Sequence, residues 1–125
     1  MNNPVLTKNF YAQAALTKYR IVMFGTTGDD YVTPAAAVSD KLLGVTTDVD
    51  TVINTRGDVV VEGITDVEYG GTVTRGDKLT TDSSGRAVTA APAAGVNNNI
   101  IGIAMVSGVV TDVGAVKISQ GIVQG

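Results

Sequence analysis

Paired carboxylates are the side chains of this chain whose spacing best suits catalysis or metal binding. They occur at Asp29 and Asp30, at Asp48 and Asp50, and at Asp66 and Glu68. Two carboxylates can catalyse glycoside hydrolysis, and an Asp-x-Asp pair can open a calcium-binding loop. The next ligand of such a loop would fall at Val52, so the calcium pattern ends after Asp50. We therefore interpret these carboxylates as solvated residues of turns and strand ends.

The side chains that most enzymes use as bases and nucleophiles are missing, because the 125 residues include no histidine and no cysteine. Their absence excludes Ser-His and Cys-His nucleophile pairs, thiolate metal sites and disulfides. Ser83 and Ser84 lie in a turn, and no base is present to activate them. We predict no catalytic residue, no metal and no cofactor, and hence a protein that is not an enzyme.

Charge and hydropathy exclude two further classes of partner. Nine basic and 12 acidic residues give a net charge of -3, and no segment gathers the basic cluster that nucleic acid requires. No apolar run approaches the roughly 18 residues of a membrane span. Met1 to Lys8 lacks the apolar core of a secretory signal. We expect no nucleic-acid partner, no membrane partner and no export.

The elements that carry these residues are predicted to be short strands. Valine and threonine are abundant, and Gly/Asp/Ser clusters interrupt the apolar runs. Strands at 19–24 and 31–33 flank one such cluster, and strands at 78–81 and 87–89 flank another, which is the pattern of a hairpin. Pro34 to Leu43 permits a short helix, but its counterpart 92–101 contains poor helix formers. We expect a loop there, with at most one helical turn.

The two halves of the chain resemble each other. Matched segments recur 56 to 58 residues apart, and common residues could also produce such matches by chance. The pairs are Leu16-Thr17-Lys18 with Val73-Thr74-Arg75, Tyr31-Val32-Thr33 with Ala87-Val88-Thr89, Leu42-Leu43-Gly44-Val45 with Ile100-Ile101-Gly102-Ile103, Gly57 with Gly114, and Gly63-Ile64 with Gly121-Ile122. We predict a single domain over 1–125, with an N-terminal arm at 1–7 and modules at 16–64 and 73–122.

The valine strand 59–61 yields a candidate contact residue. Strand side chains alternate between two faces, so Val59 and Val61 should face the core together with Val116 and Ile118. Val60 then points to the outer face, where its counterpart is Lys117. Either the strand is covered on both sides within one chain, or Val60 contacts a neighbouring subunit.

The recurring elements resemble those of tailed-phage capsid decoration, or cement, proteins. The resemblance rests on Leu43-Gly44-Val45 and Ile101-Gly102-Ile103-Ala104, each followed by a closing strand, at 57–63 and 114–121. The turn 82–88 and the opening 9–15 add to it. The likeness covers nearly the whole chain, and the second half is also similar to lambda-type head decoration proteins.

The resemblance implies a small β-barrel or β-tulip of the β-clip kind, built from two pseudo-repeated strand modules with little helix. It implies a protein made in the host cytoplasm that binds the major capsid protein on the outer surface of an expanded head and stabilises the shell, with a homotrimer favoured over a dimer or monomer. In lambda-type proteins the N-terminal segment reaches the capsid. This likeness nominates Asn2, Asn3, Pro4, Val5 and Leu6 as capsid contacts. Together with Val60, which the strand pattern nominates, they are the candidate contact residues.

Two alternatives stay open at this point. One is a tail or receptor-binding β module of a virion, since fold does not fix function. The other is a trimeric β-clip hydrolase in which Asp29, Asp58 or Asp77 would hold Mg²⁺ and a water. The chain lacks the basic and Gly-rich elements that would hold a phosphate.

The N-terminal arm is either disordered or docks as an added strand on a neighbouring protein.

Overall fold

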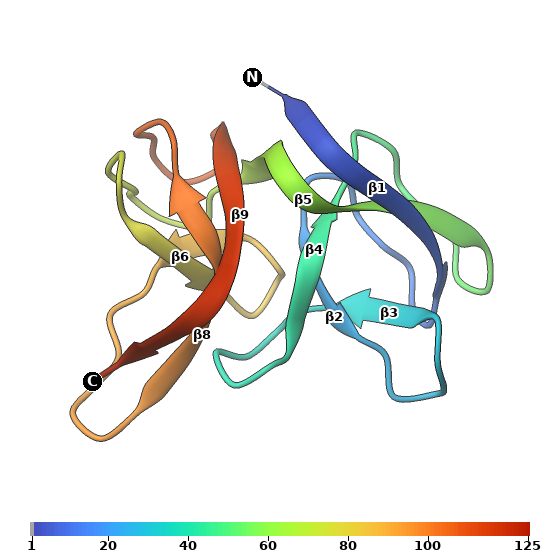
Figure 1. Ribbon diagram of the computed structural model, residues 1–125, viewed down its shortest axis with the longest axis horizontal. Helices are drawn as coiled ribbons and strands as arrows, with labels where there is room; N and C mark the ends of the chain where they lie inside the picture. Colours follow the sequence, from blue (N-terminus) through green and yellow to red (C-terminus); the bar gives the residue numbers. More distant parts are fainter. Residues whose placement is uncertain (1) are drawn as a thin grey trace.

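The computed structural model describes residues 2–125, which form nine β-strands and no helix (Figure 1). The strands are β1 (Asn3–Ala12), β2 (Ile21–Phe24), β3 (Tyr31–Pro34), β4 (Leu42–Thr46), β5 (Arg56–Glu68), β6 (Lys78–Thr81), β7 (Ala87–Thr89), β8 (Asn97–Ala104) and β9 (Val113–Gln124). The prediction of a mainly β chain is confirmed. Within the described residues, no helix is available to cross a membrane.

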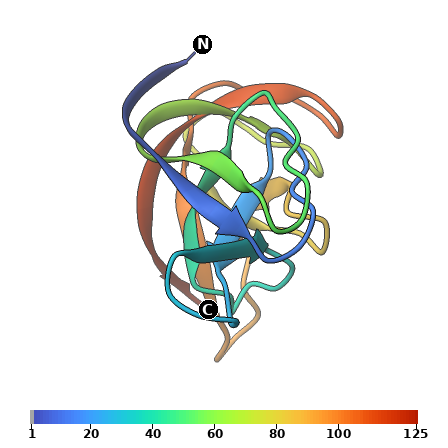
Figure 2. The same cartoon turned by 90° about the vertical axis from the view of Figure 1, so that its right-hand side faces the viewer.

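All nine strands belong to one mixed sheet, in the order β1-β3-β2-β4-β5-β9-β8-β6-β7. Strand β1 also pairs with β5, so β1 to β5 close into a ring, the first ring. Strands β6 to β9 and the end of β5 form the second ring, which is completed by one parallel bridge between Tyr69 and Ala87. In Figure 1 the first ring lies on the right and the second on the left, and β5 runs from one to the other. Figure 2 faces the first ring.

The strand pairing of the first ring recurs in the second at a spacing of 57 residues. An antiparallel bridge joins Leu16 to Thr51, and an equivalent bridge joins Val73 to Gly108. The spacing is 57 on both sides of the bridge (73 minus 16, and 108 minus 51). In each bridge both backbone N–H groups donate to the opposite carbonyls, over 2.8 to 3.0 Å.

Strand β5 belongs to both copies of this pattern. Its beginning pairs with β1, where Phe10 faces Gly57. Its end pairs with β9, where Val67 faces Gly114. The end of β5 therefore occupies in the second ring the place that β1 occupies in the first. The repeat passes from one ring to the other along one continuous strand.

Backbone conformation repeats even where the residue type does not. Tyr19 and Gly76 have φ values of 58° and 96°, and Asn54 and Thr111 have φ values of 65° and 71°. These residues are 57 positions apart in each pair. The left-handed region is costly for residues that carry a Cβ. At Tyr19, Asn54 and Thr111, tertiary pairing and not glycine therefore maintains the left-handed backbone conformation.

One predicted pair of segments is shifted in the structure. Val32 pairs with Phe24 in the β2–β3 hairpin, and Ala87 pairs with Thr81 in the β6–β7 hairpin. Val32 therefore corresponds to Ala87 at a spacing of 55, and not to Val88 at 56 as the sequence match indicated. The turn of the second hairpin is two residues shorter than that of the first, and the sequence match distributed this gap wrongly.

The predicted loop after β3 contains no helical turn. The carboxylate of Asp40 accepts hydrogen bonds from the backbone N–H groups of Ala36 and Ala37, at 2.8 and 2.9 Å. The N–H of Asp40 in turn donates to the carbonyl of Ala37. The Asp40 carboxylate thus satisfies two backbone N–H groups of the loop without a helix, and the chain turns directly into β4.

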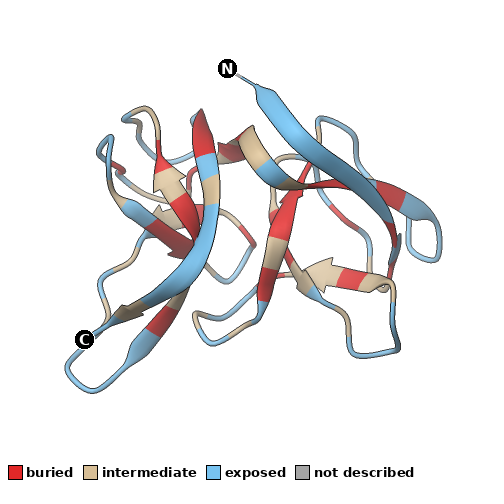
Figure 3. Ribbon diagram, in the orientation of Figure 1, coloured by how far each residue is buried: buried red, intermediate tan, exposed pale blue. Residues whose placement is uncertain are grey.

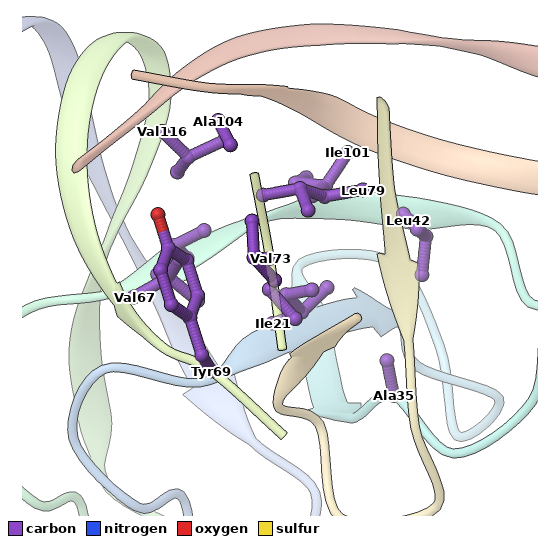
Figure 4. Packing of buried hydrophobic residues seen from close by; sticks show 12 residues of the cluster. Ile21, Ala35, Leu42, Val67, Tyr69, Val73, Leu79, Ile101, Ala104 and Val116 are labelled. Atoms are coloured by element: carbon purple, nitrogen blue, oxygen red, sulfur yellow. The ribbon is translucent and has the colours of Figure 1, made fainter. Parts of the chain in front are cut away.

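The interiors of the two rings are lined by equivalent residues. Each buried residue of the smaller core cluster has a counterpart in the larger one. These pairs are Phe10 with Val67, Ala12 with Tyr69, Leu16 with Val73, Val22 with Leu79, Val32 with Ala87, and Val59 with Val116. Figure 4 shows Tyr69, Val73, Leu79 and Val116 grouped together in the second ring. The predictions that Val59 and Val116 face the core are confirmed.

The rest of the larger cluster joins the two rings. Ile21 and Val45 belong to strands of the first ring, yet they pack in the same cluster as the second-ring interior. Beside them, the N–H of Ile21 donates to the carbonyl of Gly85 at 2.7 Å. Arg20 donates to the carbonyl of Ser84 at 2.9 Å and pairs with Glu68 at 3.4 Å. Both apolar packing and hydrogen bonds thus fix one ring against the other.

The repeated glycine of the Leu-Gly-Val and Ile-Gly-Ile elements lies where two strands approach closely. A Cβ on Gly44 would overlap the carbonyl oxygen of Val60 and lie 2.8 Å from Cγ1 of Val59. A Cβ on Gly102 would overlap the carbonyl oxygen of Lys117. In each ring, β4 or β8 crosses the following strand at a distance that only glycine permits.

Candidate partner-binding surfaces

The predicted N-terminal arm is part of a strand. Residues 3–7 belong to β1 and pair with β5, with Asn3 opposite Ile64 and Thr7 opposite Val60. Met1 lies outside the described residues. Asn2 to Asn9 are exposed, and no second strand pairs with residues 3–9 within the described chain. The segment therefore presents an open backbone edge and exposed side chains.

Two apolar side chains dominate this exposed segment. Val5 exposes 75% and Leu6 48% of their surface. The register between β1 and β5 is irregular on both sides of Leu6, and Gly63, which lies opposite Pro4, has a φ of 102°. The bulge and the glycine bend the pair where β5 leaves the first ring. Val5 and Leu6 thus lie on the outside of the junction between the rings.

The C-terminal part of β9 is exposed in the same way. Residues 119–122 are all exposed, and Ile122 exposes 65% of its surface. Among the described strands, only β8 pairs with residues 118–124. Figures 1 and 2 place this part of β9 and the exposed part of β1 on one side of the molecule, and both are pale blue in Figure 3.

The expectation that Val60 is exposed was wrong. Val60 is only 1% exposed, so it offers no surface to a neighbouring subunit. It faces Val45 across the β4–β5 pair, and Val45 belongs to the cluster that joins the two rings. Lys117 faces Ile103 in the equivalent β8–β9 pair and is exposed. The strand is covered on both sides within the chain, which was the first of the two interpretations made from the sequence.

A charged cluster lies on the outside of the first ring. Asp30 accepts from Nζ of Lys8 at 2.8 Å and from Nη2 of Arg56 at 2.7 Å. The Arg56 guanidinium lies 4.0 Å from the ring of Tyr11, which stacks on Tyr31 at 5.6 Å. The hydrogen bonds from Lys8 and Arg56 lower the pKa of Asp30 below its usual value of 3.8. The cluster joins β1, the start of β5 and the loop before β3.

The Asp30→Asn variant tests this cluster through its pH dependence. Because the folded-state pKa is lowered, the stabilisation is present above about pH 3.8 and is lost as the pH falls through the folded value. We expect the variant to melt below the parent at pH 7 and at the same temperature in strong acid. Asparagine tolerates the left-handed backbone of this residue, whose φ is 69°. Thermal melts from pH 7 to pH 2 provide the measurement, with Asp29→Asn as control. A difference that stays constant with pH would contradict the prediction.

The carboxylates that were weighed as metal ligands do not gather. No group of three or more Asp or Glu residues suited to a metal occurs in residues 2–125. Asp77 accepts from the N–H of Thr74 and from Oγ1 of Thr89, both at 2.9 Å. Asp50 accepts from the N–H of Lys18 at 2.9 Å. Both carboxylates hold turns. For Asp50 this agrees with the interpretation made from the sequence.

A cavity of about 300 Å³ opens at the end of the first ring, beside the loop that precedes β5. Its walls include Val49, Thr51 and Gly57, and charged residues of early β5 also contribute. The sequence contained no signal for it, because the loop residues carry no recognisable ligand-binding pattern.

Comparison with known proteins places these features in context. A family model described as phage cement protein matches residues 1–120. Among solved structures, the chain is similar to the head fiber gp8.5 N base of bacteriophage phi29, with a TM-score of 0.66 and 19% sequence identity, over 91% of this chain and 93% of that chain. At that identity the likeness shows a shared fold. No curated protein matches the sequence.

Proposed function

The chain belongs to the phage cement protein family, and we propose that it binds the outer surface of an expanded phage head and reinforces the shell. It is a structural, capsid-associated protein of the phage head, and the prediction that it is not an enzyme is confirmed by its family. The proposed partner is the major capsid protein. The finer description of the fold as a small β-barrel or β-tulip, and a homotrimeric assembly, belong to the same proposal.

One observation identifies the residues that would contact the shell. The exposed part of β1 combines an unpaired backbone edge with the apolar side chains of Val5 and Leu6. An open edge can accept a further strand, whose main-chain hydrogen bonds give affinity and whose side chains give specificity. Asn2 to Leu6 are therefore the proposed contact with the shell. Val60 is not part of this contact.

A double variant, Val5→Asp with Leu6→Asp, tests the contact. Burying two such aliphatic side chains contributes about 2 kcal/mol, which corresponds to roughly 30-fold in affinity. We expect the variant to bind expanded capsids that lack this protein about 30-fold more weakly than the parent, in a sedimentation assay. Its melting temperature should stay near that of the parent, because both side chains are exposed.

The matched control is Val109→Asp with Val110→Asp. These side chains expose 54% and 48% of their surface and lie on a loop of the second ring. The control should bind capsids as the parent does. Equal losses in both double variants would contradict a contact through β1. Failure of the parent itself to bind such capsids would sink the proposed function as a whole.

The likeness to a head fiber base supports a second candidate, a module that carries a tail or receptor-binding part of the virion. Cryo-electron microscopy of labelled particles separates the two candidates, because a cement protein occupies many equivalent positions over the head. The same images report the copy number at each position and hence the oligomeric state.

A further inference from the structure

The end of β9 corresponds to a segment of β5 that is paired in the first ring. Residues 120–122 are Gln-Gly-Ile and residues 62–64 are Glu-Gly-Ile, at a spacing of 58. The spacing is 57 earlier on these two strands, and the extra residue lies in the bulge of β9 between Ile118 and Gly121. The two segments therefore occupy the same place in the two rings.

The two rings differ in what lies beside this segment. In the first ring the N-terminal part of β1 covers it, with residues 3–6 opposite residues 62–64. A Cβ on Gly63 would lie 2.5 Å from a backbone nitrogen of β1. At the equivalent Gly121, beyond its neighbours in the chain, a Cβ would have only side-chain atoms of Ile100 within 4 Å among the described residues. The second ring thus lacks the strand that covers this place in the first.

The backbone groups of Ile122 point to the uncovered side of β9. The N–H of Gly125 donates to the carbonyl of Val96 at 2.9 Å, so Gly125 faces the chain that leads into β8. Backbone groups of an antiparallel strand alternate between its two edges, so those at 121 and 123 also face β8 and those at 122 and 124 face away. No strand within residues 2–125 pairs with β9 on that side beyond Lys117. Ile122 therefore offers an N–H and a carbonyl to a further strand.

The side chains of this segment suit a buried contact. Residues 118–125 carry no charge, and Gln120 stands where the first ring has Glu62. Ile122 exposes 65% of its surface. The centres of protein interfaces are poor in charged residues, because an unpaired charge is costly to remove from water. The occupant of this edge should accordingly be uncharged where it meets β9.

We propose that the open edge of β9, residues 120–124, binds an extended and uncharged segment of the shell protein, which adds to β9 as an antiparallel strand. The first ring shows the binding mode, because β1 pairs there with the equivalent residues of β5 in the antiparallel sense. Main-chain hydrogen bonds supply the affinity of such an added strand. In naming the shell as the source of the segment, the proposal rests on the proposed function.

The surroundings of the edge favour a single extended segment over a second copy of this chain. Nε2 of Gln120 donates to the carbonyl of Leu43 in β4 at 2.9 Å, so a chain that pairs with β9 lies between β9 and the first ring. An edge strand of a second copy would carry its own ring into the same space. The open parts of β9 and β1 lie on one side of the molecule (Figures 1 and 2), so a shell bound at β1 also faces β9.

Amide hydrogen exchange of the free, full-length protein tests whether the edge is open. The N–H of Val123 is bonded to β8 and that of Ile122 is not, so Ile122 should exchange at least about tenfold faster than Val123. Nuclear magnetic resonance of the ¹⁵N-labelled protein resolves the two amides. Equal protection of both would show that the edge is already covered, and the proposal would fail.

The same measurement on protein bound to expanded capsids tests the added strand. Mass spectrometry should find exchange in residues 118–125 slowed at least about tenfold, because the outward N–H groups gain partners. The exposed loop 107–112 of the same ring is the internal reference and should exchange as in the free protein. Unchanged exchange at 118–125, or equal slowing of both segments, would overturn the proposal.

Two variants of Ile122 separate the backbone from the side chain. Ile122→Ala and Ile122→Pro both shorten the exposed side chain, but only proline removes the N–H. Proline is tolerated in an edge strand where its nitrogen faces outward, so both variants should fold. We expect Ile122→Pro to bind expanded capsids at least about fivefold more weakly than Ile122→Ala, because one hydrogen bond to the added strand is lost. Equal binding of the two folded variants would contradict strand addition.

Capsid binding of the parent separates this proposal from the proposed function. If the parent binds capsids and residues 118–125 gain no protection, strand addition at β9 is wrong, while the cement function stands. If the parent does not bind capsids at all, the proposed function fails and takes the shell segment with it. Should Ile122→Pro not fold, the exchange measurements on the parent decide the matter alone.

Discussion

Replacing Tyr69 with alanine is expected to lower the free energy of unfolding by about 4 kcal/mol, because removal of a fully buried aromatic side chain leaves a cavity in a packed interior. For a chain of this length the melting temperature should fall by about 16 °C. Urea unfolding followed by circular dichroism is the measurement. The side chain contacts Gly108, Gly114 and the carbonyl of Val106, so little can move to fill the space.

The Tyr69→Phe variant is the control for this prediction. It keeps the ring and removes one hydrogen bond, so the expected loss is about 1 kcal/mol. Burial raises the pKa of the Tyr69 phenol above 10.0, and the charge of Asp112 adds to the increase. The resulting stabilisation is complete below pH 10 and is lost as the pH rises through the folded value. The phenylalanine variant should lack this component. A cost of less than about 1 kcal/mol for Tyr69→Ala would contradict the packing described here.

The second large effect is expected at Gly102. A methyl group there would overlap the carbonyl oxygen of Lys117, which belongs to the neighbouring strand β9 and cannot turn away without breaking the β8–β9 pairing. We expect Gly102→Ala to cost about 3 kcal/mol, at the upper end of the usual range for overpacking, and to lower the melting temperature by about 12 °C. The equivalent Gly44→Ala should behave similarly, because Val60 and Val59 enclose that position.

Gly121→Ala is the matched control, since a Cβ there would lie 3.7 Å from the Ile100 side chain, at ordinary contact distance. Its effect should stay within about 0.5 kcal/mol. Scanning calorimetry of the three glycine variants tests the comparison in one experiment. Equal melting temperatures for Gly102→Ala and Gly121→Ala would show that the strands separate more easily than their geometry indicates.

The sequence predicted those parts of the fold in which residue type is tied to backbone geometry. The Leu-Gly-Val and Ile-Gly-Ile elements revealed the repeat, because the close crossing at Gly44 and Gly102 permits no other residue. The equivalence of β1 with the end of β5 was missed. Only the inward-facing residues correspond, Phe10 to Val67 and Ala12 to Tyr69. The larger side chain is in the first ring at one of these positions and in the second ring at the other, so the residue types do not match.

The candidate surfaces were harder to predict for related reasons. Alternation along 59–61 indicated correctly that Val59 and Val60 face opposite sides, but not that the outer side of the first ring is covered within the chain. That cover depends on contacts between residues far apart in sequence, such as Ile21 with Gly85. The exposed apolar residues at 5–6 were identified from their sequence. The strand that carries them was not, because its partner lies more than 50 residues away.

The continuity of β5 has a mechanical consequence. Because one strand belongs to both rings, no loop separates them that could act as a hinge, and Gly63 bends the strand without interrupting its pairing with β1. A force that pulls the rings apart therefore acts along β5, parallel to the strand and across its ladders with β1 and β9. Hydrogen bonds loaded in this direction resist in shear and must break together, whereas those of a peeled hairpin break one after another. A molecule tied in this way transmits strain from one ring to the other without yielding between them.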